Sequence, residues 1–457
     1  MYSSNLILKT EKLVNFLNFS STNPTPKAEF SVAKFIQPIN KIVFESTCLS
    51  INNKIRNFFF WENPSLNESF LAIDEFLKID DTFSFDSTVL LSNQDEFDVV
   101  KIPDFIISEK FPVNRNDEIW SDYEFSHRFI PKVIFSKKNS DYFLTIFFDT
   151  RDSRTYTKII EELQEYLNDL INISNKIFNN PTINVHYKTE YSEWERIIEH
   201  SLTKIRQKEI NKVVLSRYIS CNINSNWDLF GLSRKLINDY PDSYIFIYRR
   251  NNSIFLGVSP EKLITINNNF IETEALAGTI ARGENDFEDH KLSEYLLNDN
   301  KELSEHKSVV DYIIKTLSEI STDIDYKDPV IKQLKYVQHL WTPIKAKLKP
   351  GYSIQSIIDK LHPTPAVCGD PKEKALGLIK NLENFDRGLF TGLLGWYNIN
   401  GFGEIAVAIR SALIKNKKLL LFAGCGIVEG STPEKEYAET ELKLKSILSL
   451  FENETTN

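Results

Sequence analysis

Residues 418 to 443 read Lys-Leu-Leu-Leu-Phe-Ala-Gly-Cys-Gly-Ile-Val-Glu-Gly-Ser-Thr-Pro-Glu-Lys-Glu-Tyr-Ala-Glu-Thr-Glu-Leu-Lys, an apolar run followed by glycines and then by charged residues. The apolar run predicts a strand over Lys418–Ala423, and the later spacing predicts a helix from Pro433 to about Leu450. The chain turns at the glycines between them, where the exposed amides of Gly424 and Gly426 are suited to hold a carboxylate. A strand, a glycine turn and a helix in this order favour an α/β fold.

The segments before this stretch also alternate between strand and helix patterns, which supports the α/β assignment. Strands are predicted at 212–219, 244–248, 254–256, 262–266 and 403–414, and in the amino-terminal part at 57–61 and 142–148. Helices are predicted at 153–174, from Ser192 with Glu195 as a capping box, at 286–318 and at 371–384. No Pro-, Gly- or Ser-rich linker divides the chain, so one large two-layer body is as consistent with its length as several domains.

The composition narrows the class of partner. The 457 residues include 54 Lys plus Arg and 63 Asp plus Glu, a formal charge of −9, which argues against a nucleic-acid partner. Four separated cysteines without a C-x-x-C pair indicate neither a zinc site nor a disulfide framework. With no export signal and no run of 18 apolar residues, we expect a cytoplasmic protein that does not enter membranes.

Two pairs of glutamates stand out, Glu302 with Glu305 and Glu436 with Glu439. Each pair has i, i+3 spacing, which places both carboxylates on one face of a predicted helix. Like charges so placed repel one another, and hard oxygen ligands of this kind suit Mg²⁺ if both pairs face one cavity. The alternative is that both pairs lie on solvated helix faces, and spacing alone favours that alternative.

Three further side chains could serve acid-base chemistry or anion binding. Lys212 begins a predicted strand and Glu261 follows another, so the two could form a general base and a general acid if burial lowered the pKa of the lysine. The residues alone favour the alternative, a surface lysine at a strand end and a glutamate that begins a turn. Arg410 ends an apolar strand, where a buried guanidinium needs an anionic partner, either a substrate or a structural carboxylate.

His339 and His362 are read as hydrogen-bonded structural residues, because no H-E-x-x-H motif supports zinc.

The sequence has no strong motif for nucleotide binding or for a serine nucleophile. The glycines resemble a dinucleotide fingerprint, but Gly430 comes one place late for G-x-G-x-x-G. No G-x-x-x-x-G-K-[ST] loop and no G-x-S-x-G elbow occur in the sequence.

Seven ordered blocks within 212–443 resemble the chorismate-utilising enzymes, and among them the isochorismate synthases. The blocks are 212–217, 255–263, 273–279, 301–306, 362–369, 406–411 and 424–443. The resemblance implies a single α/β (α+β) domain, in which antiparallel sheets of two similar halves stack as a sandwich with helices outside and the site in a cleft. Residues 1–185 match only weakly as the amino-terminal part of this sandwich, and 186–457 form the chorismate-binding catalytic region.

The same resemblance implies a reaction, the reversible Mg²⁺-dependent conversion of chorismate to isochorismate. Water adds at C2 and the C4 hydroxyl leaves, with Lys212 as the base and Glu261 as the acid. Glu305 and Glu439 would ligate Mg²⁺, supported by Glu302 and Glu436. The substrate would be bound by Ala277, Gly278, Thr279, His339, Thr364, Arg410, Gly424, Gly426 and Lys443.

Related activities are distinguished by single positions. Anthranilate synthases generally lack a lysine at the position of Lys212, and aminodeoxychorismate synthases carry one at that of Ala277. Salicylate synthases, which continue to pyruvate loss, are the nearest alternative, and a catalytically silent chorismate-binding protein is another. We expect a monomer without a glutaminase subunit, serving menaquinone or siderophore biosynthesis. Two departures from the family pattern are Cys425 for alanine and Phe390 for tyrosine.

Overall fold

The computed structural model describes most of the chain. The described residues are 30–51, 55–79, 88–92, 102–113, 115–149, 156–171, 183–223 and 228–451, together with Leu8 and Leu13. The predicted helix at 153–174 is α3, Tyr156–Ile171, and the flanks of that prediction lie outside the described residues.

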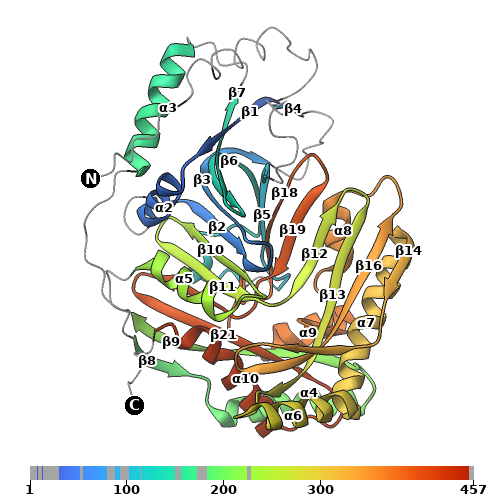
Figure 1. Cartoon of the computed structure of the whole chain (residues 1–457). Coiled ribbons are helices and arrows are strands. Elements are labelled where there is room, and N and C mark those ends of the chain that lie inside the picture. Colours follow the sequence, from blue (N-terminus) through green and yellow to red (C-terminus); the bar gives the residue numbers. More distant parts are fainter. Residues whose placement is uncertain are drawn as a thin grey trace.

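The strands form one continuous sheet with two arms that face each other (Figure 1). The first arm runs, in order of pairing, through β8 Ile183–Lys188, β9 Lys212–Ile223, β21 Lys418–Ile427, β20 Ser411–Lys415, β11 Ser253–Ser259, β10 Tyr244–Arg250, β2 Phe58–Asn63, β3 Glu68–Ile79, β6 Ser126–Lys138, β7 Asp141–Asp149, β1 Phe30–Ile39 and β4 Thr88–Ser92. The second arm leaves β6 through β5 Phe105–Glu109, β18 Leu393–Tyr397, β19 Phe402–Val407, β12 Lys262–Asn267, β13 Phe270–Ala281 and β16 Val337–Leu348, which also pairs with β14 Ser321–Tyr326 and β15 Val330–Gln333. A short strand, β17 Gly369–Asp370, pairs with β9.

The strand β6 belongs to both arms. Its amino-terminal part pairs with β5, its carboxy-terminal part pairs with β7, and β3 runs along its other edge. Among the described strands the pairings are antiparallel, apart from β1 with β4. The predicted sandwich of antiparallel sheets is therefore confirmed as the architecture, with one sheet folded over itself instead of two separate sheets.

Alternation along β2 shows how the sequence builds the two cores. Phe59 and Trp61 point into a cluster between the arms, whereas Phe58 and Phe60 point into a second cluster beneath the helices. Successive side chains of a strand face opposite sides, so a run of aromatic residues buries both faces of the sheet. The run predicted at 57–61 is a central strand for this reason.

Helices cover the outer faces of both arms (Figure 1). In the described chain they are α2 Lys41–Ser50, α3, α4 Tyr191–Arg206, α5 Leu229–Asp239, α6 Asp286–Asn298, α7 Asn300–Ile320, α8 Ile354–Leu361, α9 Lys372–Leu382 and α10 Pro433–Leu448, with 3-10 turns at Pro64–Leu66 and Glu118–Trp120. The helix α10 packs on β21 of the first arm, and α7 packs on β13 of the second. None of the described helices combines the length and the apolar character needed to cross a bilayer.

Three details of the predicted elements were wrong. The helix predicted at 286–318 is two helices, because Asp299 is extended and its carboxylate accepts a hydrogen bond from Glu302 N at 3.0 Å, which begins α7. The predicted capping box at Ser192 does not form, since α4 begins after Glu190 without a side-chain cap. The predicted glycine turn is strand as far as Ile427, because β21 pairs with β9 through both glycines.

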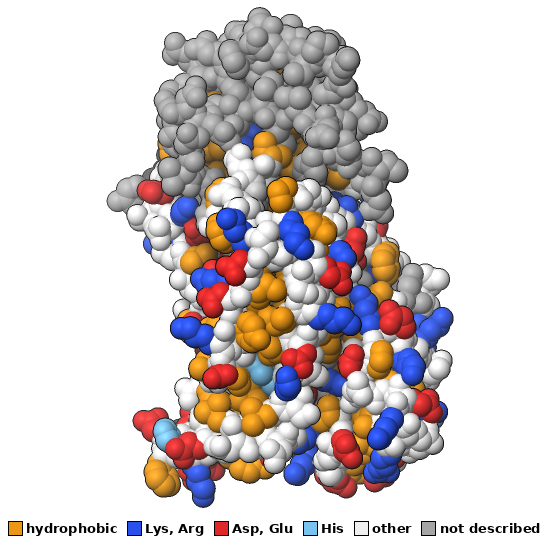
Figure 2. Space-filling view, turned by 90° about the vertical axis from the view of Figure 1, so that its right-hand side faces the viewer, with side chains coloured by type: hydrophobic (Ala, Val, Ile, Leu, Met, Phe, Trp, Pro, Cys, Tyr) orange, Lys and Arg blue, Asp and Glu red, His pale blue; other side chains and the backbone are white. Residues whose placement is uncertain are grey.

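Basic and acidic side chains are interspersed over the face shown in Figure 2, where no continuous basic stripe is visible.

All four cysteines are buried and free, as the sequence predicted for reduced thiols.

Candidate active site

A cavity lies where the end of β21 in the first arm approaches β13 in the second. It encloses about 620 Å³ of space between atoms, its open mouth included. Ten of the predicted site residues line it: Glu261, Ala277, Gly278, Thr279, Glu305, His339, Arg410, Gly424, Gly426 and Lys443. The sequence blocks that carry these residues are far apart along the chain, and the fold brings them to one place.

Four other predicted residues lie beside the cavity and not in its wall: Lys212, Glu302, Glu436 and Glu439. Lys212 is buried and its Nζ lies 2.8 Å from Glu305 Oε1. The placement of Thr364 differs from the prediction. It does not line the cavity, and its hydroxyl accepts a hydrogen bond from Ala366 N at 3.3 Å within the turn that precedes Cys368. The wall on that side is formed by Ala366 and Val367 instead.

The two glutamate pairs lie at the amino-terminal ends of α7 and α10. Glu302 and Glu436 are in the first turns, after the caps Asp299 and Thr432. A helix amino terminus carries a partial positive charge, which favours carboxylates there. The i, i+3 spacing places each pair on one helix face, and the amino-terminal ends of α7 and α10 both lie beside the cavity.

Lysines accompany these carboxylates. Lys443 Nζ lies 2.6 Å from Glu439 Oε1 and donates to Gly424 O at 2.9 Å. Lys301 Nζ lies 3.0 Å from both Glu302 Oε1 and Glu436 Oε1. With the contact between Lys212 and Glu305, each glutamate of the two pairs has a lysine neighbour.

Burial and neighbouring charges shift the pKa values of these carboxyl groups in different directions. Burial raises the pKa of Glu302, and Glu305 raises it further. Burial and Glu439 raise the pKa of Glu436 to about 7. At Glu305 burial acts in the same sense, but the ammonium groups of Lys212 and Lys301 outweigh it and hold the pKa below its usual range. The cluster thus carries a local excess of buried negative charge that a cation relieves.

Carboxylate oxygens are the ligands that Mg²⁺ prefers, and the cluster supplies them from two helices. Glu436 Oε2 is buried and lacks a hydrogen-bond partner, so this oxygen is free to accept a cation. Within the part of the chain that the structure describes, no three acidic, histidine or cysteine side chains already form a metal-binding arrangement. The donor set fits magnesium, and an ion that used these oxygens would have to displace their lysine contacts.

Gly426 leaves the space in which Lys212 and Glu305 contact each other. A Cβ at this position would lie 2.2 Å from Glu305 Oε1 and 2.7 Å from Lys212 Cε. The extended backbone of β21 thus passes directly against the pair. Gly278 has a different requirement, because its φ of 80° is in the left-handed region that favours glycine.

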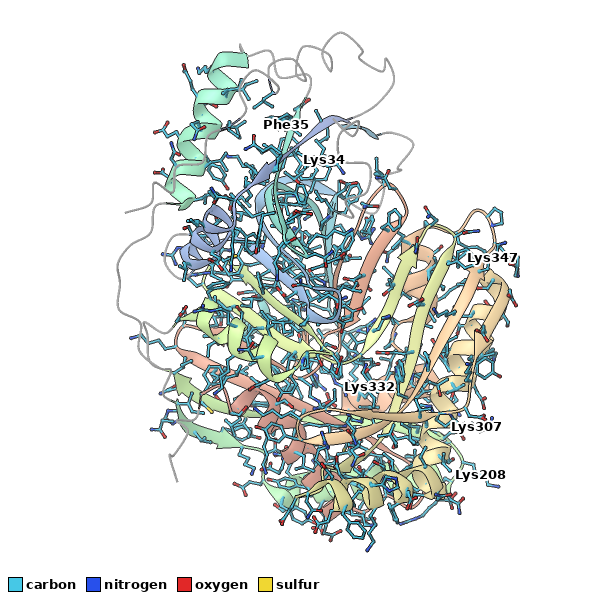
Figure 3. All side chains as sticks on the ribbon, in the orientation of Figure 1. Lys34, Phe35, Lys208, Lys307, Lys332 and Lys347 are labelled. Carbon is cyan, nitrogen blue, oxygen red and sulfur yellow. The ribbon has the colours of Figure 1, made fainter. Side chains whose placement is uncertain are left out.

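Glu261 faces the same cavity with a perturbed carboxyl. Its side chain is 5% exposed, and burial raises its pKa to about 8, with Glu274 contributing in the same direction. At pH 7 this carboxyl is therefore mainly protonated and can donate a proton. Lys332, which Figure 3 places between the arms, bridges Pro260 O at 2.8 Å and Glu274 Oε1 at 3.4 Å.

Arg410 and His339 form a hydrogen-bonded pair in the cavity wall. Arg410 Nη2 lies 3.1 Å from His339 Nε2, and a guanidinium can only donate, so Nε2 accepts and the proton lies on Nδ1. Nδ1 is 3.2 Å from Gly278 O, which accepts it. Burial, then Arg410, hold the pKa of His339 well below its usual range, so the ring is neutral. Among the described residues no carboxylate pairs with Arg410 within 4.0 Å, which leaves its charge available to a bound anion.

Several residues with a role in the site carried no assignment from the sequence. Lys301 and His306 stand in the block 301–306, next to the glutamates. His306 is buried, lies 3.1 Å from Ala277 O and braces the cavity wall, and burial lowers its pKa to about 4. His362 contacts Thr391 O at 2.9 Å, which confirms its structural role.

A buried ion pair supports the wall from behind. Arg387 Nη2 lies 2.5 Å from Glu383 Oε1, and the guanidinium also donates to Val214 O and Val367 O, two residues of the cavity wall. Both residues lie beyond the end of α9, so helical spacing gave no signal for this pair.

A model of the family described as chorismate binding enzyme matches residues 18–452. The isochorismate synthase MenF of Bacillus subtilis is 33% identical over 344 residues, 75% of this chain and 73% of that protein. The salicylate biosynthesis isochorismate synthase of Pseudomonas aeruginosa is 40% identical over 259 residues, 56% of this chain and 54% of that protein.

Among solved structures, MenF, the menaquinone-specific isochorismate synthase of Escherichia coli, has the same fold. It superposes with a TM-score of 0.78 at 23% identity and the match covers 97% of this chain and 99% of that one.

Proposed function

The chain belongs to the family of chorismate-binding enzymes, and we propose that it acts in this family as an isochorismate synthase. The reaction exchanges a hydroxyl group between two ring carbons of chorismate. Water adds at C2, the C4 hydroxyl leaves as water, and the double bond shifts, so that the net change is an isomerisation.

One observation carries this proposal: a protonated carboxylic acid and a buried lysine lie at the same cavity. Glu261, with its pKa raised to about 8, lines the cavity, and Lys212 lies beside the cavity, next to the wall residues Glu305 and Gly426. In the proposed reaction, Lys212 as a free amine takes a proton from the attacking water and Glu261 gives its proton to the departing C4 hydroxyl. A lysine must lose its proton before it acts as the base.

Arg410 supports the choice of a carboxylate substrate. It lines the cavity and is buried, and its guanidinium donates to the neutral side chains of His339 and Ser446. A guanidinium held in this way binds a carboxylate in a forked geometry. We assign it to one carboxylate of chorismate, together with backbone groups near Gly424 and Gly426 and the ammonium of Lys443.

We also propose that the site uses Mg²⁺. Glu305 and Glu439 would hold the ion, with Glu302 and Glu436 as further or water-mediated ligands. When bound, the ion neutralises and orients the ring carboxylate of the substrate. The other proposed properties are a cytoplasmic monomer without a glutaminase subunit, since water and not ammonia is the nucleophile, serving menaquinone or siderophore biosynthesis.

The test is to incubate the purified chain with chorismate and Mg²⁺ and to separate the products by chromatography. Isochorismate without a second enzyme supports the proposal. Folded protein that forms none would contradict it. Fluorescent salicylate in the same reaction would make the chain a salicylate synthase instead. Lys212→Ala is expected to remove most of the rate, since general base catalysis contributes roughly 10²–10⁴-fold.

A further inference from the structure

Lys301 is the cation at the centre of the acidic cluster. Its Nζ lies 3.0 Å from Glu302 Oε1 on its own helix and 3.0 Å from Glu436 Oε1 on α10. The side chain is 22% exposed, whereas that of Glu436 is 1% exposed. Burial lowers the pKa of Lys301, but the four glutamates, Glu436 and Glu302 first, outweigh it and raise the pKa above its usual range, so the side chain is an ammonium ion at neutral pH.

The contacts of Lys301 use oxygen atoms that a metal ion would need. The two carboxylate oxygens of Glu302 are both engaged, one by Lys301 and the other by Thr279 N at 2.9 Å. Glu436 keeps only Oε2 without a partner. A divalent ion that drew on both glutamates would therefore meet a unit positive charge already beside them, and like charges at such distances repel strongly in a buried site.

Lys301 differs in this respect from the two other lysines of the cluster. Lys443 lines the cavity, and Lys212 borders it. Lys301 is not part of the cavity wall, and its contacts link α7 to α10 across the acidic groups. Its position therefore serves the carboxylates and not the substrate.

We propose that Lys301 is a tethered counter-ion, which holds the carboxylates of Glu302 and Glu436 together when no metal is bound and competes with the metal for them. This inference rests on the proposed magnesium site. It has two consequences: the lysine stabilises the metal-free protein, and it weakens metal binding by the same coupling. The protein then binds Mg²⁺ less tightly than its four carboxylates alone would allow.

The test uses the full chain with Lys301→Met, which keeps the length of the side chain and removes its charge. Magnesium chloride is titrated by calorimetry in the absence of chorismate, and thermal unfolding is recorded with a chelator and with Mg²⁺. We expect Lys301→Met to bind Mg²⁺ about tenfold more tightly than the unaltered chain. We also expect Lys301→Met to unfold at a lower temperature than the unaltered chain in chelator. Its unfolding temperature should rise by more than that of the unaltered chain when Mg²⁺ is added.

Two matched variants separate charge from other effects. Lys301→Arg keeps the charge and should match the unaltered chain in its stability without metal and in its affinity for Mg²⁺. Lys307→Met removes a charge on the same helix from the exposed outer face that Figure 3 shows, where Lys307 pairs with Asp311, and should change neither measurement.

The outcomes distinguish this role from the proposed function. Unchanged or weaker Mg²⁺ binding by Lys301→Met, in a chain whose unaltered form does bind Mg²⁺, overturns the counter-ion role alone. No Mg²⁺ binding by either form overturns the magnesium site and this role together. Should Lys301→Met not fold in chelator, refolding on addition of Mg²⁺ supports the proposal, and no rescue contradicts it.

Discussion

Glu261 combines burial with an acidic neighbour, and both keep its proton in place. Its pKa is about 8 in the folded chain against an ordinary value of 4.5. Between those values the unfolded chain has lost the proton and the folded chain has kept it, so this group makes the protein less stable as the pH rises through that window. The loss is complete above about pH 8.

The first prediction follows from this pKa. Glu261→Gln should remove a decline of up to about 1.4 kcal/mol in the free energy of unfolding per pH unit between pH 5 and 8. The unaltered enzyme should lose activity above about pH 8 as the acid ionises, and the variant should be nearly inactive at every pH. Urea unfolding and initial rates across the pH range check both statements. Parallel stability curves for the two proteins would contradict the assignment.

Gly426 gives the second prediction. Gly426→Ala places a methyl group 2.2 Å from Glu305 Oε1 and should displace the pair that Glu305 forms with Lys212. Because the displaced groups are the proposed general base and a proposed metal ligand, we expect the rate to fall at least about 100-fold. The control is Gly377→Ala in the helix α9, where a Cβ meets nothing within 4 Å. That variant should keep full activity and gain about 0.5–1 kcal/mol in stability. Equal activity of the two variants would refute the packing argument.

At this scale, the sequence was informative about residue type and spacing, but not about contacts. Spacing alone favoured solvated positions for the glutamate pairs and for Lys212 with Glu261, and the family resemblance singled them out; ten of the predicted residues do line one cavity. The lysine that lies between Glu302 and Glu436 was not foreseen, because its second partner is 135 residues away in the sequence and only tertiary structure brings them together. Thr364 does not line the cavity, and its hydroxyl accepts a hydrogen bond from the local backbone in a proline-rich turn.

At the scale of elements, the cap at Asp299 separates α6 from α7 and fixes where the first glutamate pair begins. Asp299→Ala removes the acceptor for Glu302 N and should cost about 1 kcal/mol of stability. It should also weaken Mg²⁺ binding, because Glu302 loses its fixed position. Asn285→Ala is the matched control, since Asn285 caps α6 through Glu288 N at 3.1 Å.

The control variant should lose similar stability without any change in Mg²⁺ affinity. Thermal unfolding and calorimetric titration measure the two effects. If both variants weakened Mg²⁺ binding to the same degree, a general loss of helix would explain the result.

Strand and helix types were largely predictable, and their ends were not. Apolar residues identified β9, β10, β12 and α10; β9 and β10 are buried on both faces along most of their length, whereas α10 buries one face. The helix pattern at 286–318 continued through Asp299, since periodicity does not register a cap that interrupts it for one residue. The glycines of β21 were expected to turn because of their intrinsic freedom, but pairing with β9 along the whole strand outweighs that preference.

At the scale of the whole molecule, the division at residue 185 does not correspond to separable units. It falls inside β8, and residues before it supply β2 beside β10 and β5 beside β18. Residues 186–457 expressed alone would therefore expose two strand edges that are paired in the full chain. We expect this fragment to aggregate, because unpaired edges associate with one another. A soluble, monomeric fragment in size-exclusion chromatography would show that the catalytic region folds independently.

The helices that carry the two glutamate pairs rest on different arms of the sheet, α7 on β13 and α10 on β21. The ammonium of Lys301 spans from one to the other. Product release that widens the space between the arms would stretch this contact. A substitution that loosens either helix would therefore disturb this contact as well as the carboxylates that the helix carries.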